Sequence, residues 1–142
     1  MSFNSYERSL LAALADVLIP AGDGFPAASG AGIAGDGLDQ LLVYRPDLGP
    51  GLKKLLAVTD GQPAAEIVAR LKARDPAGFG LLAELVSGAY FLNPDVRAKL
   101  NYHGQGPRPI DPRPDYLDDG LLQSVLDRGP IYRPTPIDQT QK

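Results

Sequence analysis

The sequence predicts an all-α protein: a compact bundle of about five to seven helices with a long Gly-rich loop and an extended Pro-rich C-terminal arm. Apolar residues recur at helical spacing in several segments, and 16 glycines and 14 prolines separate these segments. No segment alternates apolar and polar residues with the two-residue period that is typical of strands. We therefore expect a helical domain at residues 1–103 and an arm at residues 104–142.

The first helix is predicted at residues 5–19. Asn4 or Ser5 provides its N-terminal cap, and Pro20 ends it. Its apolar residues recur with the period of a helix and so form one stripe along it: Leu10, Leu11, Leu14, Val17 and Leu18. We expect this stripe to face the core.

A loop is predicted at residues 20–37, because six glycines between Gly22 and Gly37 are too many for a regular helix or strand. Loops longer than about 12–15 residues are uncommon in compact domains and are often functional. Phe25 and Ile33 are the apolar side chains that we expect to hold this loop against the core.

Five further helices are predicted before the arm. Each begins at a capping residue or a proline, and these starts are Asp36, Pro46-Asp47, Pro63, Asp75-Pro76 and Asn93-Pro94. The second of the five ends near Thr59, and the last ends near Leu100. The segment after Pro76 is apolar nearly all round, so we expect it to be the central helix, with Tyr90 in the core.

The C-terminal arm has a different character, since seven of the 14 prolines lie in residues 107–136. One short helix is predicted at residues 116–128, and the remainder is expected to be extended. Such a segment cannot build a core of its own. Its sparse apolar anchors favour wrapping over a surface, and they are Tyr102, Ile110, Tyr116, Ile131 and Tyr132.

Composition excludes several classes of function. The net charge is −3 and no basic cluster stands out, so we expect no nucleic-acid partner. The absence of cysteine excludes disulfide frameworks, iron–sulfur clusters and thiolate zinc sites. The apolar run from Leu10 to Pro20 is too short for a bilayer span or a signal peptide. We therefore expect no direct membrane insertion and, for the sequence as written, a cytoplasmic location.

Four polar patterns in the sequence are candidate functional sites. Gly30–Gly35 reads G-x-G-x-x-G, but no strand is predicted before it, so we interpret it as a loop and not as a nucleotide site. His103 is the only histidine, and no serine nucleophile is predicted beside it. Asp16 is interpreted as a hydrogen-bond acceptor for the glycine loop. A further acidic group fits helix capping better than metal binding, and its members are Asp111, Asp115, Asp118 and Asp119.

Two segments carry a resemblance to a known family. Residues 10–20 read LLAALADVLIP and precede a loop with Pro26-Ala27-Ala28, while residues 88–105 read GAYFLNPDVRAKLNYHGQ. In order and spacing they resemble the gluconate 2-dehydrogenase subunit 3 family. Two departures are visible: the sequence as written does not begin with the twin-arginine signal of many members, and Asn101 stands where glycine is usual.

The resemblance implies a non-catalytic small subunit that stabilises and helps to mature a large flavoprotein of the glucose–methanol–choline (GMC) oxidoreductase type. That partner would hold FAD and oxidise a sugar or polyol, and some such complexes include a cytochrome c subunit. No catalytic, cofactor-binding or metal-binding residue is implied in this chain. A periplasmic location follows if the chain is exported with its partner or if a leader was removed.

The predicted interface combines the second matched segment with the arm. Its residues are Phe91, Asn93, Pro94, Tyr102, His103, Gln105, Pro107, Arg108, Pro109, Ile110, Tyr116, Ile131 and Tyr132. Two alternative functions stay open. In the first, the chain is a stand-alone ligand-binding module that uses the loop at residues 20–37. In the second, it is a homo-oligomer whose arms exchange between copies.

Overall fold

The computed structural model describes residues 2–58, 61–106 and 119–131. Within these ranges the fold is all-α, with seven α-helices and no strand, as the sequence predicts. The helices are α1 (Ser5–Leu18), α2 (Leu38–Tyr44), α3 (Leu48–Ala57), α4 (Ala64–Arg74), α5 (Pro76–Leu92), α6 (Pro94–Lys99) and α8 (Gln123–Arg128). The chain divides into two units, Met1–Gly104 and Gln105–Lys142, so the first unit holds α1 to α6 and the second holds α8.

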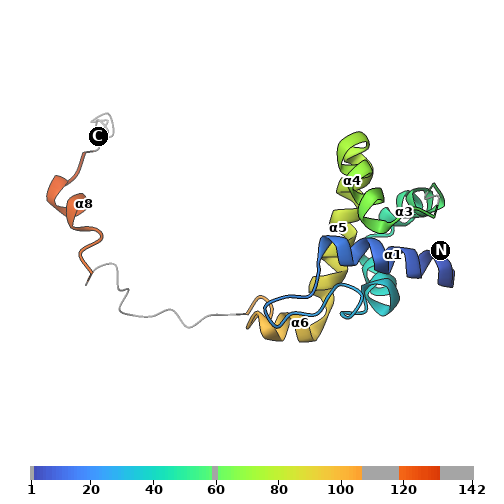
Figure 1. Cartoon of the computed structure of the whole chain (residues 1–142). Helices are drawn as coiled ribbons and strands as arrows, with labels where there is room; N and C mark the ends of the chain where they lie inside the picture. The colour runs from blue at the N-terminus through green and yellow to red at the C-terminus, as the bar shows by residue number, and fades with distance from the viewer. Residues whose placement is uncertain (1, 59–60, 107–118, 132–142) are drawn as a thin grey trace, which may run out of the picture. The chain divides into compact units, whose positions relative to one another are not determined.

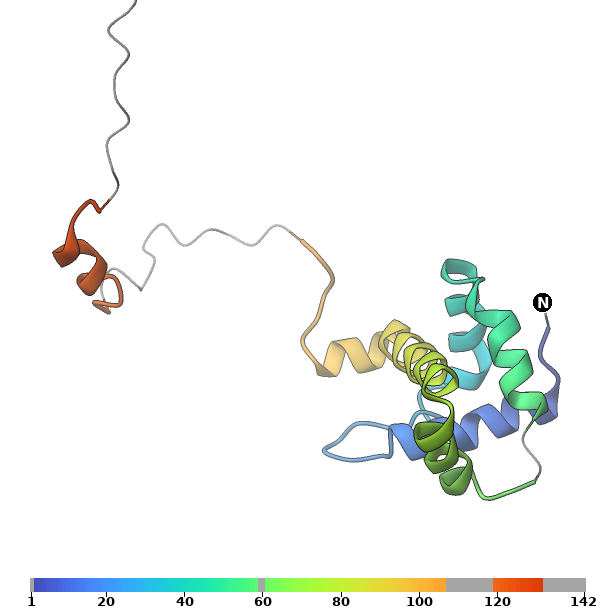
Figure 2. The same ribbon diagram turned by 90° about the horizontal axis from the view of Figure 1, so that it is seen from above.

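α5 is the central helix of the first unit. It contacts each of the other five helices of that unit, and in both views it lies among them (Figure 1, Figure 2). Leu82, Leu85 and Val86 are fully buried, and Tyr90 is 4% exposed. A helix surrounded on most sides needs apolar residues nearly all round, which is why its sequence shows no clear polar face.

Most helix starts follow from local chemistry. Asn4 and Glu7 form a reciprocal capping box at α1, in which each side chain accepts the other residue's backbone N–H. Asp75 accepts the N–H of Gly78 at the start of α5, and Asn93 caps α6. These three predicted caps are confirmed.

One predicted helix cap is wrong, and one predicted helix start lacks a side-chain cap. Asp36 does not cap α2, because a turn, η1 (Ile33–Gly37), leads directly into that helix. The turn is closed by the Gly37 N–H, which donates to the carbonyl of Gly32, and it is kinked at Gly35, whose φ of −102° and ψ of −117° are not helical. α3 begins directly after Pro46 and Asp47, as predicted, and Asp47 occupies the N-cap position. Its carboxylate makes no capping bond and is hydrogen-bonded to Arg45 at 2.7 and 2.9 Å.

The predicted arm helix is shorter than expected. α8 begins at Gln123, and its predicted first residues, 116–118, lie outside the described part of the chain. Gly120 adopts a left-handed φ of +69°, which is incompatible with a helix running through it. Val125 and Leu126 of α8 are 55% and 62% exposed, and Leu121, which precedes the helix, is 71% exposed, so the described residues of this unit bury none of the three.

Candidate functional site

The predicted interface begins at the end of α5, where two adjacent aromatic residues have opposite roles. Tyr90 is buried and donates its hydroxyl to the carbonyl oxygen of Pro26 at 2.8 Å, so the prediction that it belongs to the core is confirmed. Phe91 is 52% exposed, and its ring meets that of Tyr90 edge-on with centroids 5.8 Å apart. Phe91 therefore offers apolar surface outside the core.

Asn93 fixes the junction between α5, α6 and the glycine loop. Its Oδ1 accepts the N–H groups of Asp95 and Val96, and its Nδ2 donates to the carbonyl oxygen of Ala31 at 2.9 Å. All its polar groups thus have partners inside the unit. Asn93 acts in positioning the surface, whereas Pro94, the first residue of α6, is exposed.

The turn after α6 explains why asparagine is suited to position 101. Asn101 has a φ of +53°, in the left-handed region that glycine favours and that asparagine tolerates best among other residues. The N–H of Tyr102 donates to the carbonyl of Arg97, and that of Asn101 donates to Ala98. These two bonds form a Schellman motif, so asparagine makes the turn that glycine commonly makes.

This turn places two of the predicted residues on one shallow depression. Tyr102, which is 50% exposed, and His103 line it together with three residues of α6, and it has a volume of 190 Å³. Those three residues are Pro94, Arg97 and Ala98. The His103 ring Nε2 lies 2.9 Å from Oδ1 of Asn101, and the buried Nε of Arg97 has no hydrogen-bond partner.

The predicted interface residues of the second unit are described only in part. Gln105 is exposed, and Ile131 is 77% exposed in the second unit. Six others lie outside the described residues, and they are Pro107, Arg108, Pro109, Ile110, Tyr116 and Tyr132. The structure therefore unites Pro94, Tyr102 and His103 and leaves the contribution of the arm as a prediction.

The glycine loop is anchored by polar contacts that the sequence analysis predicted only in part. Asp16 accepts both the N–H and the hydroxyl of Ser29 at 2.7 Å, which confirms its structural role. Lys99 donates to the carbonyl of Gly24 at 2.6 Å. Ile33 is fully buried, and Phe25 packs against the core as expected.

The G-x-G-x-x-G letters do not lie in a strand–turn–helix setting. Gly30 follows loop residues, Gly32 adopts a φ of +73°, and Gly35 lies in η1. A 420 Å³ pocket does open here, and it is lined by Ala31, Gly32, Gly35, Asp36, Gly37, Gln40, Ala89, Leu92, Asn93 and Pro94. The loop thus has room beside it without the geometry of a dinucleotide fold.

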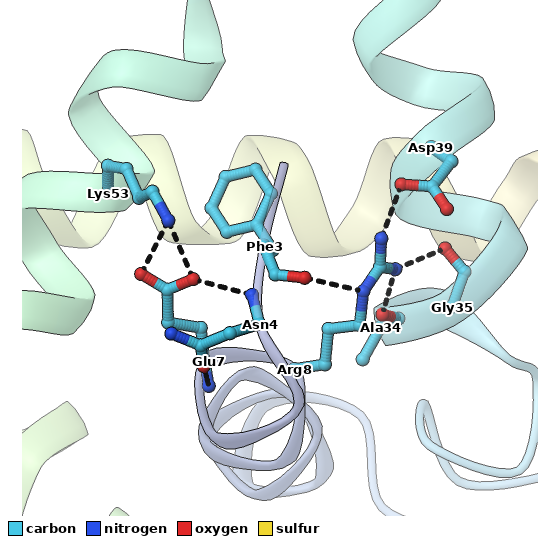
Figure 3. A network of polar contacts seen from close by, with 8 residues as sticks. All are labelled: Phe3, Asn4, Glu7, Arg8, Ala34, Gly35, Asp39 and Lys53. Carbon is cyan, nitrogen blue, oxygen red and sulfur yellow. Dashed lines mark hydrogen bonds and ion pairs between the residues drawn. The ribbon is translucent and has the colours of Figure 1, made fainter. Parts of the chain in front are cut away.

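A polar network joins the N-terminus to the glycine loop and to α3 (Figure 3). Lys53 Nζ donates to both carboxylate oxygens of Glu7 at 2.7 Å and lies 5.0 Å from the centroid of the Phe3 ring. Arg8 donates to the carbonyls of Ala34 and Gly35 and forms an ion pair with Asp39. The Lys53 ammonium and the Asn4 N–H together lower the pKa of Glu7.

Sequence reasoning missed this network. The Asn-x-x-Glu spacing at the start of α1 is a capping-box pattern that could have been recognised. No local pattern, however, indicates that Lys53 or Asp39 lies opposite this helix, because they are 46 and 31 residues away in sequence.

Among the described residues, no three His, Asp or Glu side chains gather as metal ligands would. Asp119 is exposed, while Asp111, Asp115 and Asp118 lie outside these ranges. None of the described helices combines the length and apolar character that a membrane crossing requires.

Comparison with known proteins adds no relative. No family model, curated protein or solved structure matches this chain.

Proposed function

We propose that this chain is a small, non-catalytic subunit that binds and stabilises a large FAD-dependent oxidoreductase of the GMC type acting on a sugar or polyol. One observation carries the proposal. The segment at residues 88–105, which bears the more specific resemblance, also presents large exposed apolar side chains: Phe91, Leu100 and Tyr102 are 49–52% exposed. Aromatic side chains of this kind are enriched at protein interfaces.

The local geometry supports such a role because the surface is rigidly held. Asn93 ties α5, α6 and the loop together, and the Schellman turn fixes the backbone that carries Tyr102 and His103. Side chains on a fixed backbone lose less conformational entropy when a partner binds. FAD and the redox chemistry would belong to the partner, and some complexes of the family that the chain resembles also include a cytochrome c subunit.

Purification from the native host through a tag, under gentle conditions, tests the proposal. We expect a second polypeptide of flavoprotein size and a flavin absorbance spectrum. The truncation that removes residues 104–142 is expected to weaken this association and to leave the helical unit folded. A colourless single-component preparation would contradict the proposal, and unchanged co-purification after truncation would exclude the arm as an interface.

A pair of matched tyrosine variants sharpens this experiment. Tyr102→Ala should reduce the flavin recovered per mole of chain, whereas Tyr44→Ala should not, although Tyr44 is 64% exposed on α2. Circular dichroism of both variants shows whether the fold is retained. An equal effect of the two substitutions would mean that the segment at residues 88–105 is not the contact.

The pocket beside the glycine loop favours a second candidate, a ligand-binding module. Gly32, Gly35 and Gly37 present backbone to this pocket, and Asp36 and Gln40 add polar side chains. Titration of the purified chain with NAD or FAD, followed by its melting temperature, tests this candidate. A ligand-dependent rise in melting temperature without any partner would favour it over the accessory-subunit role.

A further inference from the structure

A groove lies between α3 and α4, on a different part of the unit from the depression at α6. Both helices pack against α5 (Figure 1), and the groove between them has a volume of 590 Å³. Its lining residues are Gly51, Lys54, Leu55, Val58, Ile67, Arg70, Leu71, Arg74, Asp75, Ala77, Gly78 and Leu81.

The floor of this groove is apolar and remains partly in contact with solvent. Ile67 is fully buried beneath it, while Leu55, Leu71 and Leu81 are half-buried. Val58 at its edge is 71% exposed. A contiguous apolar surface of this kind is a feature of interaction sites, because covering it removes apolar area from water.

The rim of the groove is positively charged. Lys54 and Arg74 form no ion pair with any described residue, and Arg70 donates to the side-chain oxygen of Gln62 at 2.6 Å. Asp75 is the single acidic lining residue, and its carboxylate is already used to cap α5 through the N–H of Gly78. The groove is therefore lined by three cationic side chains and by one carboxylate, which is already hydrogen-bonded to the backbone.

We propose that this groove receives an amphipathic helix with acidic flanks from a partner polypeptide. The α4 lining residues run from Ile67 to Arg74, a span of about 10 Å at 1.5 Å per residue, which matches two helical turns. An open edge at Val58 suits a helix, since a docked helix keeps its polar side in water, whereas a small ligand is usually enclosed.

The positive charge of the rim favours helices with acidic side chains among those that fit the groove. Acidic side chains beside the apolar stripe would pair with Lys54 and Arg74, which have no counter-ion among the described residues. A second copy of this chain offers α8, but Asp127 and Arg128 leave that helix without net charge. The inference does not depend on the partner being a flavoprotein, and its test uses the full chain alone.

The test measures fluorescence anisotropy of two labelled 20-residue helical peptides with the same leucine stripe. One peptide has glutamates beside the stripe and the other has lysines. We expect the full chain to bind the glutamate peptide at least about tenfold more tightly. Arg74→Glu should remove this preference, while Lys72→Glu should retain it, because Lys72 lies on α4 but does not line the groove.

A second variant tests the shape of the groove. Ala77 is exposed at the groove wall, so Ala77→Trp should fill the space and weaken peptide binding at least about tenfold without unfolding the chain. Circular dichroism provides the check on folding. Unchanged peptide affinity in this folded variant would overturn the assignment.

The other outcomes also decide the proposal. It is overturned if neither peptide binds, if both bind equally, or if Lys72→Glu acts like Arg74→Glu. Displacement of a bound peptide by a peptide of residues 115–131, together with a dimeric mass in light scattering, would assign the groove to a second copy instead. Tighter binding of laurate than of the glutamate peptide would assign it to a small amphiphile.

Discussion

The first unit and the α8 segment contain similar apolar residues but use them differently. α5 buries Leu82, Leu85 and Val86 completely, whereas α8 leaves Val125 and Leu126 at least 55% exposed. Both segments have leucine and valine at helical spacing. The difference is that α5 has five neighbouring helices in its unit, and the described part of the second unit contains α8 alone. Helical period therefore predicts a helix, while burial depends on what packs against it.

The largest expected change in stability comes from shortening a buried leucine of α5, compared with an exposed leucine of α8. Leu85→Ala should lower the free energy of unfolding by about 2–5 kcal/mol, because it leaves a cavity in a fully buried position. Leu126→Ala, at a residue that is 62% exposed, should change it by less than about 0.5 kcal/mol. Urea denaturation of the two variants measures both values. Equal losses would show that α8 is packed as tightly as α5.

The next effect concerns how the glycine loop is fastened to α1. Asp16→Ala should destabilise the chain by about 1–2 kcal/mol, because the N–H and the hydroxyl of Ser29 both lose their acceptor. Ser29→Ala removes only the hydroxyl bond and should cost less. The melting temperatures of the two variants give this order, and the reverse order would mean that the Asp16 contacts do not hold the loop.

The turn after α6 gives a smaller effect that depends on backbone conformation alone. Asn101→Val should destabilise the unit by about 1 kcal/mol or more, since a β-branched residue is strained at the φ of +53°. Asn101→Gly should be tolerated without loss of stability. Chemical denaturation compares them, and equal stabilities of the valine and glycine variants would contradict the left-handed turn.

The smallest expected change in stability is that of the Glu7→Gln variant, and it depends on pH. Because Lys53 and the Asn4 amide lower the folded-state pKa of Glu7, its contribution to stability is complete above the ordinary value of 4.5 and is lost as pH falls through the lowered pKa. Glu7→Gln should therefore melt below the wild type at pH 7, with a difference that shrinks below pH 4.5.

Glu66→Gln is the matched control for this pH experiment. Glu66 lies exposed in the first turn of α4 and forms no ion pair with a described residue. Its substitution should leave the melting temperature nearly unchanged across the pH range. A pH-independent difference for Glu7→Gln would show that the carboxylate contributes through packing and not through its charge.

Much of the fold follows from the sequence because its determinants are local. Asn4, Asp75 and Asn93 mark helix starts through hydrogen bonds within three residues of themselves. The nearly all-apolar sequence of α5 predicts its central position, since only a helix surrounded by others can hide such a surface. The left-handed turn at Asn101 is likewise within the conformational range of that residue.

The tertiary structure alone decided the features that join distant segments. Lys53 pairs with Glu7 and Arg8 reaches Asp39, and no local pattern encodes either pairing. Asp36 lost its predicted capping role because η1 leads directly into α2. The groove between α3 and α4 exists because both helices pack on α5 while a space remains between them, which depends on their relative placement and not on their individual sequences.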